Sequence, residues 1–188
     1  RSLEAADRRL DYFYVTLRRI DDFLVAADLA AAPPLDLDGE TTAEAKALVP
    51  TARAALADDF NTPVVVAAMG DAAKAANKLL DDARGGGAAQ KLVRRRSLAR
   101  LARDLRGVGC ALGVLQRPPR EFLVERRGRL AAARGISAAE VDRLLAARLA
   151  ARAARDYGRA DELRAELQAM AVEVHDSPTG VDWKVLEE

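Results

Sequence analysis

The sequence predicts an all-α protein, an antiparallel helical bundle that ends in a small appendage of one helix and a β-hairpin. Apolar residues recur at spacings of three, four and seven, as one face of an α-helix requires. Half of the 188 residues are hydrophobic but only 4% are aromatic, so we expect a core of Leu, Val and Ala between closely packed helices. Strand-like alternation is found in "VEVHD" and "VDWKV". We place a domain boundary between residues 1–135 and 136–188.

The first predicted helix covers residues 3–28. Six apolar residues mark its buried face: Leu3, Leu10, Phe13, Leu17, Ile20 and Leu24. Residues 29–41 are rich in Pro, Gly and Asp, which is typical of a linker.

A second helix is expected over residues 42–59, where Pro50 should kink or restart it. The next helix is expected over 62–82. Thr62 is a suitable N-cap for it, and Pro63 suits the first helical position.

The "GGG" sequence at 85–87 predicts a break before a long basic helix over residues 89–115. "RPP" at 117–119 ends that helix, because proline cannot continue it. A shorter helix should follow over residues 120–133.

Two capping signals define the last helices. Ser137 with Glu140 three residues later is a capping box, and the helix it opens should run to about residue 155. Asp156 is the expected N-cap of a helix over 157–170. "SPTG" between the two alternating stretches then predicts the turn of a β-hairpin.

The net charge of +1 conceals a strong segregation along the chain. Residues 1–90 carry −5, residues 91–155 carry +12 and residues 156–188 carry −6. For any single arginine, a solvated helix face is the simpler interpretation. The basic block as a whole predicts a polyanionic partner such as nucleic acid.

No catalytic constellation is evident. One cysteine, Cys110, and one histidine, His175, cannot make the usual zinc site or an internal disulfide. Cys110 lies in an apolar helix, so we expect it to be buried. Phosphate-binding loops and nucleophile elbows are missing, and no apolar run approaches the ~20 residues of a membrane span. We therefore expect neither a metal nor a cofactor here, no membrane partner, and a cytoplasmic location.

The stretch "RDYGRADELRAEL", residues 155–167, contains two stripes at helical spacing. The predicted core stripe consists of Ala160, Leu163, Leu167 and Met170. A second stripe, about 110° away around the helix, consists of Tyr157, Asp161, Arg164 and Gln168. Its aromatic, acidic, guanidinium and amide groups are those that read nucleobases. The alternative is an ordinary surface with a Tyr–Asp contact and an Asp–Arg ion pair.

Three segments carry a resemblance to one family. "ARAARDYGRADELRAELQAMAVEVHDSPTGVDW" resembles the C-terminal tail of bacterial cysteinyl-tRNA synthetases, which are class I aminoacyl-tRNA synthetases. "ALADDFNTPVVVAAM" resembles the family's D-D-F-N-T-P helix start, and "DRRLDYFYVTLRRID" the helix after its catalytic domain. The resemblance covers nearly the whole chain in order. It implies the DALR helical bundle plus an anticodon-reading end piece.

The resemblance also assigns roles to individual residues. Tyr157 takes the position of the aromatic on which an anticodon base stacks. Asp161 and Arg164 take positions that hydrogen-bond anticodon base edges, and Arg152 takes a further base- or phosphate-contacting position. Asp176 would lie beside them in the hairpin turn.

Trp183 takes the tryptophan position of the family's T-x-W pattern, and we interpret it as a packing anchor between hairpin and helix. The family's nucleotide-binding domain, where ATP and zinc are expected, has no counterpart here, so we expect this fragment alone not to be an enzyme. The implied partner is cysteine tRNA, and the implied parent ligates cysteine to that tRNA with ATP. We expect a monomer.

Two alternative functions stay open from the sequence. One is the related anticodon domain of arginyl-tRNA synthetase, against which the F-N-T-P start and the terminal hairpin argue. The other is a helical adaptor that binds protein, whose binding would depend less steeply on salt than binding to nucleic acid.

Overall fold

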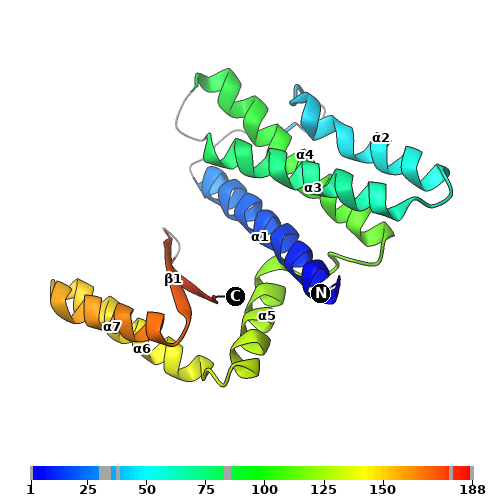
Figure 1. Cartoon of the computed structure of the whole chain (residues 1–188). Helices are drawn as coiled ribbons and strands as arrows, with labels where there is room; N and C mark the ends of the chain where they lie inside the picture. Colours follow the sequence, from blue (N-terminus) through cyan, green and yellow to red (C-terminus); the bar gives the residue numbers. More distant parts are fainter. Residues whose placement is uncertain (1, 30–34, 37–38, 83–85, 178–179, 187–188) are drawn as a thin grey trace. The chain divides into compact units, whose positions relative to one another are not determined.

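The computed structural model describes residues 2–29, 35–36, 39–82, 86–177 and 180–186. These residues form seven helices and one antiparallel pair of strands, which confirms the predicted fold class. The elements are α1 (Ser2–Leu29), α2 (Ala43–Ala57), α3 (Thr62–Asp81), α4 (Ala88–Ala111), α5 (Pro119–Ala133), α6 (Ala138–Ala153), α7 (Tyr157–Ala169), β1 (Val172–Ser177) and β2 (Gly180–Val185) (Figure 1).

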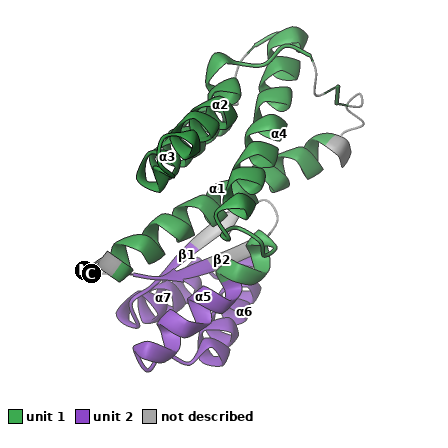
Figure 2. Cartoon of the chain, turned by 90° about the vertical axis from the view of Figure 1, so that its right-hand side faces the viewer, with its two compact units in different colours: residues 1–123 green, residues 124–188 purple. Residues whose placement is uncertain are grey.

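The chain divides into two compact units, residues 1–123 and 124–188 (Figure 2). The division falls within α5, whereas the sequence suggested a boundary after residue 135. The physical reason is that the second half of α5 has its own apolar contacts in the second unit. Ala131 is 1% exposed and packs in the same cluster as Val141.

The first unit is built on helices α1 to α4. α2 contacts α3 and α4, and α1 contacts the same two helices. Its fully buried large side chains come from all four helices: Leu17, Ile20, Leu48, Val65, Met69, Leu98, Leu101 and Leu105. Buried alanines such as Ala52, Ala73 and Ala102 lie between them and let the helices approach closely. Leu3 is 84% exposed, because it lies in the first turn of α1, before the packed part of that helix.

The start of α3 differs from the prediction. Asn61, not Thr62, is the N-cap, and Thr62 is the first helical residue. Asp59 and Phe60 have φ angles of 52° and 53°, and this left-handed pair turns the chain one residue earlier than the Thr-Pro pattern suggests. Pro63 lies in the first helical positions as expected.

Two further local predictions are corrected by the structure. α2 continues through Pro50 rather than restarting there, and Pro50 lies on the exposed side of that helix. Cys110 is exposed rather than buried, because it occupies the solvent side of the last turn of α4 while Val108 and Gly109 face the core.

The second unit has a separate core. α6 contacts α7, and α7 contacts β1. The predicted stripe of α7 is confirmed, with Ala160, Leu163 and Leu167 between 0 and 4% exposed. The hairpin pairs Val172 with Val185 and Val174 with Trp183 in antiparallel register.

We predict that Leu167→Ala lowers the free energy of unfolding by about 2–5 kcal/mol, because it leaves a cavity under α7. Urea denaturation followed by circular dichroism measures the change. The matched control is Gln168→Ala, an exposed neighbour on the same helix, which should change stability by no more than about 0.5 kcal/mol. Equal effects from the two substitutions would contradict the packing described here.

Candidate nucleic-acid interface

The start of α7 is fixed by the side chain of Asp156. Its Oδ1 accepts a hydrogen bond from the Arg159 backbone N–H at 3.0 Å, as the sequence predicted. The preceding residue, Arg155, has a φ of 60°, so the chain reverses sharply after α6. Tyr157 therefore stands at the first position of α7, with 63% of its surface exposed.

The stripe predicted to read a ligand lies on the exposed side of α7. Tyr157, Asp161, Arg164 and Gln168 are all exposed. Within the described part of the chain, Asp161 and Arg164 form neither an ion pair nor a hydrogen bond. The surface ion pair expected from the alternative interpretation is therefore not formed among the described residues.

Two more of the predicted site residues, Arg152 and Asp176, lie in α6 and β1. Arg152 is exposed in the last turn of α6, so it lies at the same end of the α6–α7 helix pair as Tyr157. Asp176 was expected in the hairpin turn, but it lies in β1 opposite Val181, because strand pairing continues to Ser177 and Gly180. The side chain of Asp176 is outside the described residues.

Trp183 is 4% exposed and belongs to the core of the second unit. Its indole N–H donates to Asp142 Oδ1 at 3.1 Å. The Arg127 guanidinium carbon lies 4.6 Å from the centre of the ring. Trp183 thus joins the hairpin to α5 and α6, as a packing anchor would. Asp142 and Arg127 were not predicted from the sequence, although a buried indole N–H requires an acceptor.

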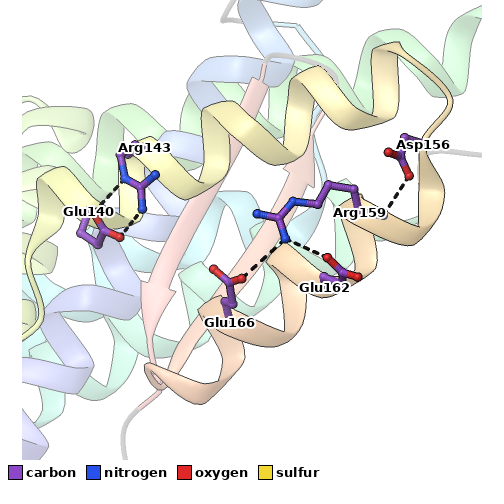
Figure 3. A network of polar contacts seen from close by, with 6 residues as sticks. All are labelled: Glu140, Arg143, Asp156, Arg159, Glu162 and Glu166. Atoms are coloured by element: carbon purple, nitrogen blue, oxygen red, sulfur yellow. Dashed lines mark hydrogen bonds and ion pairs between the residues drawn. The ribbon is translucent and has the colours of Figure 1, made fainter.

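A network of charged groups lies across α6 and α7 (Figure 3). Arg159 Nη1 is 2.7 Å from Glu162 Oε2 and 3.8 Å from Glu166 Oε1. On α6, Arg143 donates to both carboxylate oxygens of Glu140, at 2.6 and 2.9 Å. This network was not foreseen from the sequence, although both arginines lie three residues from a glutamate.

Hydrogen bonds in this network shift the pKa of Glu140, Arg143 and Arg159. The hydrogen bond from Arg143 lowers the pKa of Glu140 below its ordinary value. The hydrogen bond to Glu162 raises the pKa of Arg159 above its own ordinary value. Both shifts favour the charged forms of Glu140 and Arg159.

Several arginines of the basic block, residues 91–155, form ion pairs within the first unit. Arg106 Nη2 reaches both oxygens of Asp21, at 2.8 and 2.7 Å. Arg120 pairs with Asp22. Further pairs join Arg96 to Asp36, and Arg100 and Arg103 to Asp104. Asp21, Asp22 and Asp36 of the acidic N-terminal half thus each pair with an arginine of the basic block.

The described residues contain no cluster of three or more His, Cys, Asp or Glu side chains that could hold a metal ion. Among the same residues, no helix has the length and apolar character needed to cross a membrane.

Two family models match the chain. The model of the DALR domain matches residues 52–116, and that of the cysteinyl-tRNA ligase anticodon binding domain matches residues 137–183. All six residues singled out from the sequence lie in the second match: Arg152, Tyr157, Asp161, Arg164, Asp176 and Trp183.

Curated relatives agree with these matches. A cysteine–tRNA ligase from Anaeromyxobacter dehalogenans strain 2CP-1 is 42% identical over 97% of this chain and 34% of its own length. One from Geobacter metallireducens is 38% identical over 98% of this chain and 36% of its own length. The chain therefore spans about a third of the length of these relatives. That third is their C-terminal, anticodon-binding part, and the catalytic domain is absent from the 188 residues.

We predict that Asp142→Ala destabilises the second unit by about 1–3 kcal/mol, because it leaves the buried indole N–H of Trp183 without its acceptor. Asp142→Asn keeps an acceptor oxygen and should stay close to the unsubstituted chain. Thermal unfolding followed by Trp183 fluorescence compares them, since this is the one tryptophan of the chain. Indistinguishable curves for the two variants would argue against this hydrogen bond.

Proposed function

We propose that this chain, which belongs to the cysteine–tRNA ligase family through its DALR and anticodon-binding domains, reads the anticodon of cysteine tRNA with the exposed face of α7. The observation that carries the proposal is the alignment of Tyr157, Asp161 and Arg164 on one exposed stripe. That stripe lies inside the stretch that matches an anticodon-binding domain.

Each of the three groups suits one part of base recognition. The exposed ring of Tyr157 offers a face on which a base can stack, largely irrespective of its identity. The Arg164 guanidinium can donate two parallel hydrogen bonds to adjacent acceptors on a base edge. The Asp161 carboxylate accepts from amino or imino donors. The three residues together supply a stacking surface, a bidentate donor and an acceptor.

Arg152 and Asp176 complete the proposed surface. Arg152 lies at the end of α6 that adjoins Tyr157, where a guanidinium would meet the phosphate or edge of the neighbouring nucleotide. Asp176 would contribute from β1. These two roles follow from the family resemblance.

The activity of a whole ligase lies beyond these residues. We propose that the parent protein attaches cysteine to its tRNA with ATP, and that ATP and zinc bind in its catalytic domain. A monomeric, cytoplasmic parent fits this role. The anticodon domain of arginyl-tRNA synthetase gains no support, because the matched anticodon-binding model is the cysteinyl one. The alternative of an adaptor that binds protein also gains no support, because the matched models are the DALR domain and the anticodon binding domain of cysteinyl-tRNA ligase.

We predict that Arg164→Ala loses about 1–3 kcal/mol of discrimination at one anticodon position, because a bidentate contact is removed. Tyr157→Ala should lose about 1–3 kcal/mol of stacking, with less dependence on the base. Fluorescence anisotropy with anticodon stem-loops that differ by one base measures both effects. Since both side chains are exposed, the folding of the second unit should be unchanged.

The matched control for this experiment is Gln116→Ala, an exposed polar residue of the first unit. It should leave affinity and discrimination intact. If the Tyr157→Ala/Arg164→Ala double variant discriminated between anticodons as well as the unsubstituted chain, the proposal that α7 reads the anticodon would be wrong.

We further predict that the purified 188-residue chain supports no cysteine-dependent exchange of pyrophosphate into ATP. The reason is that neither of its two matched domains is a nucleotide-binding domain. A full-length relative assayed in parallel is the positive control. Exchange above background that depends on cysteine would contradict the assignment of this chain to the tRNA-binding part alone.

A further inference from the structure

α7 contains two arginines that lie on opposite sides of the helix. Arg164 belongs to the exposed stripe of Tyr157, Asp161, Arg164 and Gln168, which we call the reading stripe. A second polar flank of α7 carries Arg159, Glu162 and Glu166. At 100° per residue, this flank lies roughly 160° around the helix axis from the reading stripe. α7 therefore presents two polar flanks to solvent, and in the proposed function only the Tyr157 flank faces the anticodon.

The two arginines differ in their surroundings. Arg159 is held by Glu162 at 2.7 Å and approached by Glu166 at 3.8 Å. It also lies close enough to Asp156 for that carboxylate to favour its charged form. Arg164 has no ion pair within the described residues. One guanidinium is thus offered to a ligand, whereas the other is occupied by carboxylates.

The same arrangement extends to α6. Arg143 is held by Glu140 through two hydrogen bonds, and Glu166 on α7 adds to its electrostatic stabilisation (Figure 3). The six side chains of this flank are two arginines and four carboxylates, so its net charge is −2. The reading stripe carries one arginine and one aspartate among its charged groups and is neutral.

We propose that Glu162 and Glu166 are specificity-determining residues that keep Arg159 from contacting phosphate and so prevent RNA from binding the wrong flank of α7. This inference rests on the proposed function. It assigns to the network a task that concerns the orientation of bound RNA rather than the reading of a base.

The physical reason lies in how RNA binds without specificity. Each guanidinium that neutralises a phosphate releases counterions, and this contribution is independent of sequence. An accessible Arg159 would therefore stabilise a misoriented complex in which the anticodon meets no reading groups. Carboxylates beside it repel the phosphate and compete for the guanidinium, which is how a binding site disfavours a wrong partner.

A purely stabilising role explains the network less well. Arg159, Glu162 and Glu166 are each half exposed or more, and exposed ion pairs contribute little to folding. The net charge of −6 over residues 156–188 is also unexpected for a surface that binds a polyanion. It is expected for one that must bind RNA on one flank only.

The test compares four versions of the 188-residue chain: unsubstituted, Glu162→Gln/Glu166→Gln, the same pair with Arg159→Gln, and Glu44→Gln/Glu121→Gln as a control. The control removes the same charge from exposed positions of the first unit. Each is titrated by anisotropy with a cysteine-tRNA stem-loop and with the same stem carrying another anticodon, between about 50 and 200 mM salt. Circular dichroism checks that each version is folded.

We expect Glu162→Gln/Glu166→Gln to bind the non-cognate stem-loop several-fold more tightly, with a salt dependence steeper by about one unit of slope. Discrimination between the two RNAs should fall. Adding Arg159→Gln should reverse the gain, and the control pair should show no comparable gain.

Three results would overturn the inference: no gain in non-cognate binding, a gain that persists after Arg159→Gln, or an equal gain in the control pair. The proposed function fails separately. It fails if the unsubstituted chain does not prefer the cysteine stem-loop, whereas the inference fails when that preference exists but the substitutions do not change it as described.

Discussion

The narrow apolar stripe of α7 is the constraint on which the proposed site depends. Ala160, Leu163 and Leu167 are buried at one-turn spacing, and their burial sets the rotation of the helix about its axis. Once that rotation is set, helical geometry places one polar set of side chains on each flank. The Tyr157 flank is neutral and offers unpaired polar groups, whereas the Arg159 flank is acidic and internally paired. Neither flank would have a defined orientation without the buried stripe between them.

Part of the charge in this chain joins helices of its first unit. The acidic N-terminal half and the basic segment after it form ion pairs between helices of the first unit, as between Asp21 and Arg106. A count of charges along the sequence therefore overstates the basic surface available to RNA. The proposed reading surface lies instead in a segment of net negative charge, where recognition would come from a few placed groups. Such an arrangement favours selectivity over affinity.

Local signals in the sequence predicted the fold well. Ser137 accepts from the backbone N–H of Glu140 at 3.3 Å, and Asp156 caps α7, because an N-cap involves atoms only a few residues apart. The exposed stripe of α7 followed from helical spacing in the same way. The predicted capping box is confirmed only in its Ser137 half, because the Glu140 side chain accepts hydrogen bonds from Arg143 instead.

Features that depend on distant residues could not be predicted. The partner of the Trp183 indole, Asp142, lies 41 residues away in the sequence, and no local pattern connects the two. The exposure of Cys110 depends on which side of α4 the other helices cover. The role of Arg159 is hidden for a related reason. Its spacing to Glu162 is that of any surface ion pair. The pair gains its proposed role only because the reading stripe with Arg164 lies on the opposite flank of α7.

Contact between RNA and the Tyr157 flank of α7 can be mapped by backbone amide chemical shifts, in a titration of the labelled chain with a cysteine-tRNA anticodon stem-loop. We expect the largest shifts on α7 around Tyr157, Asp161 and Arg164 and at the end of α6. Shifts concentrated on the basic helix α4, or around Arg159 and Glu166, would contradict this contact.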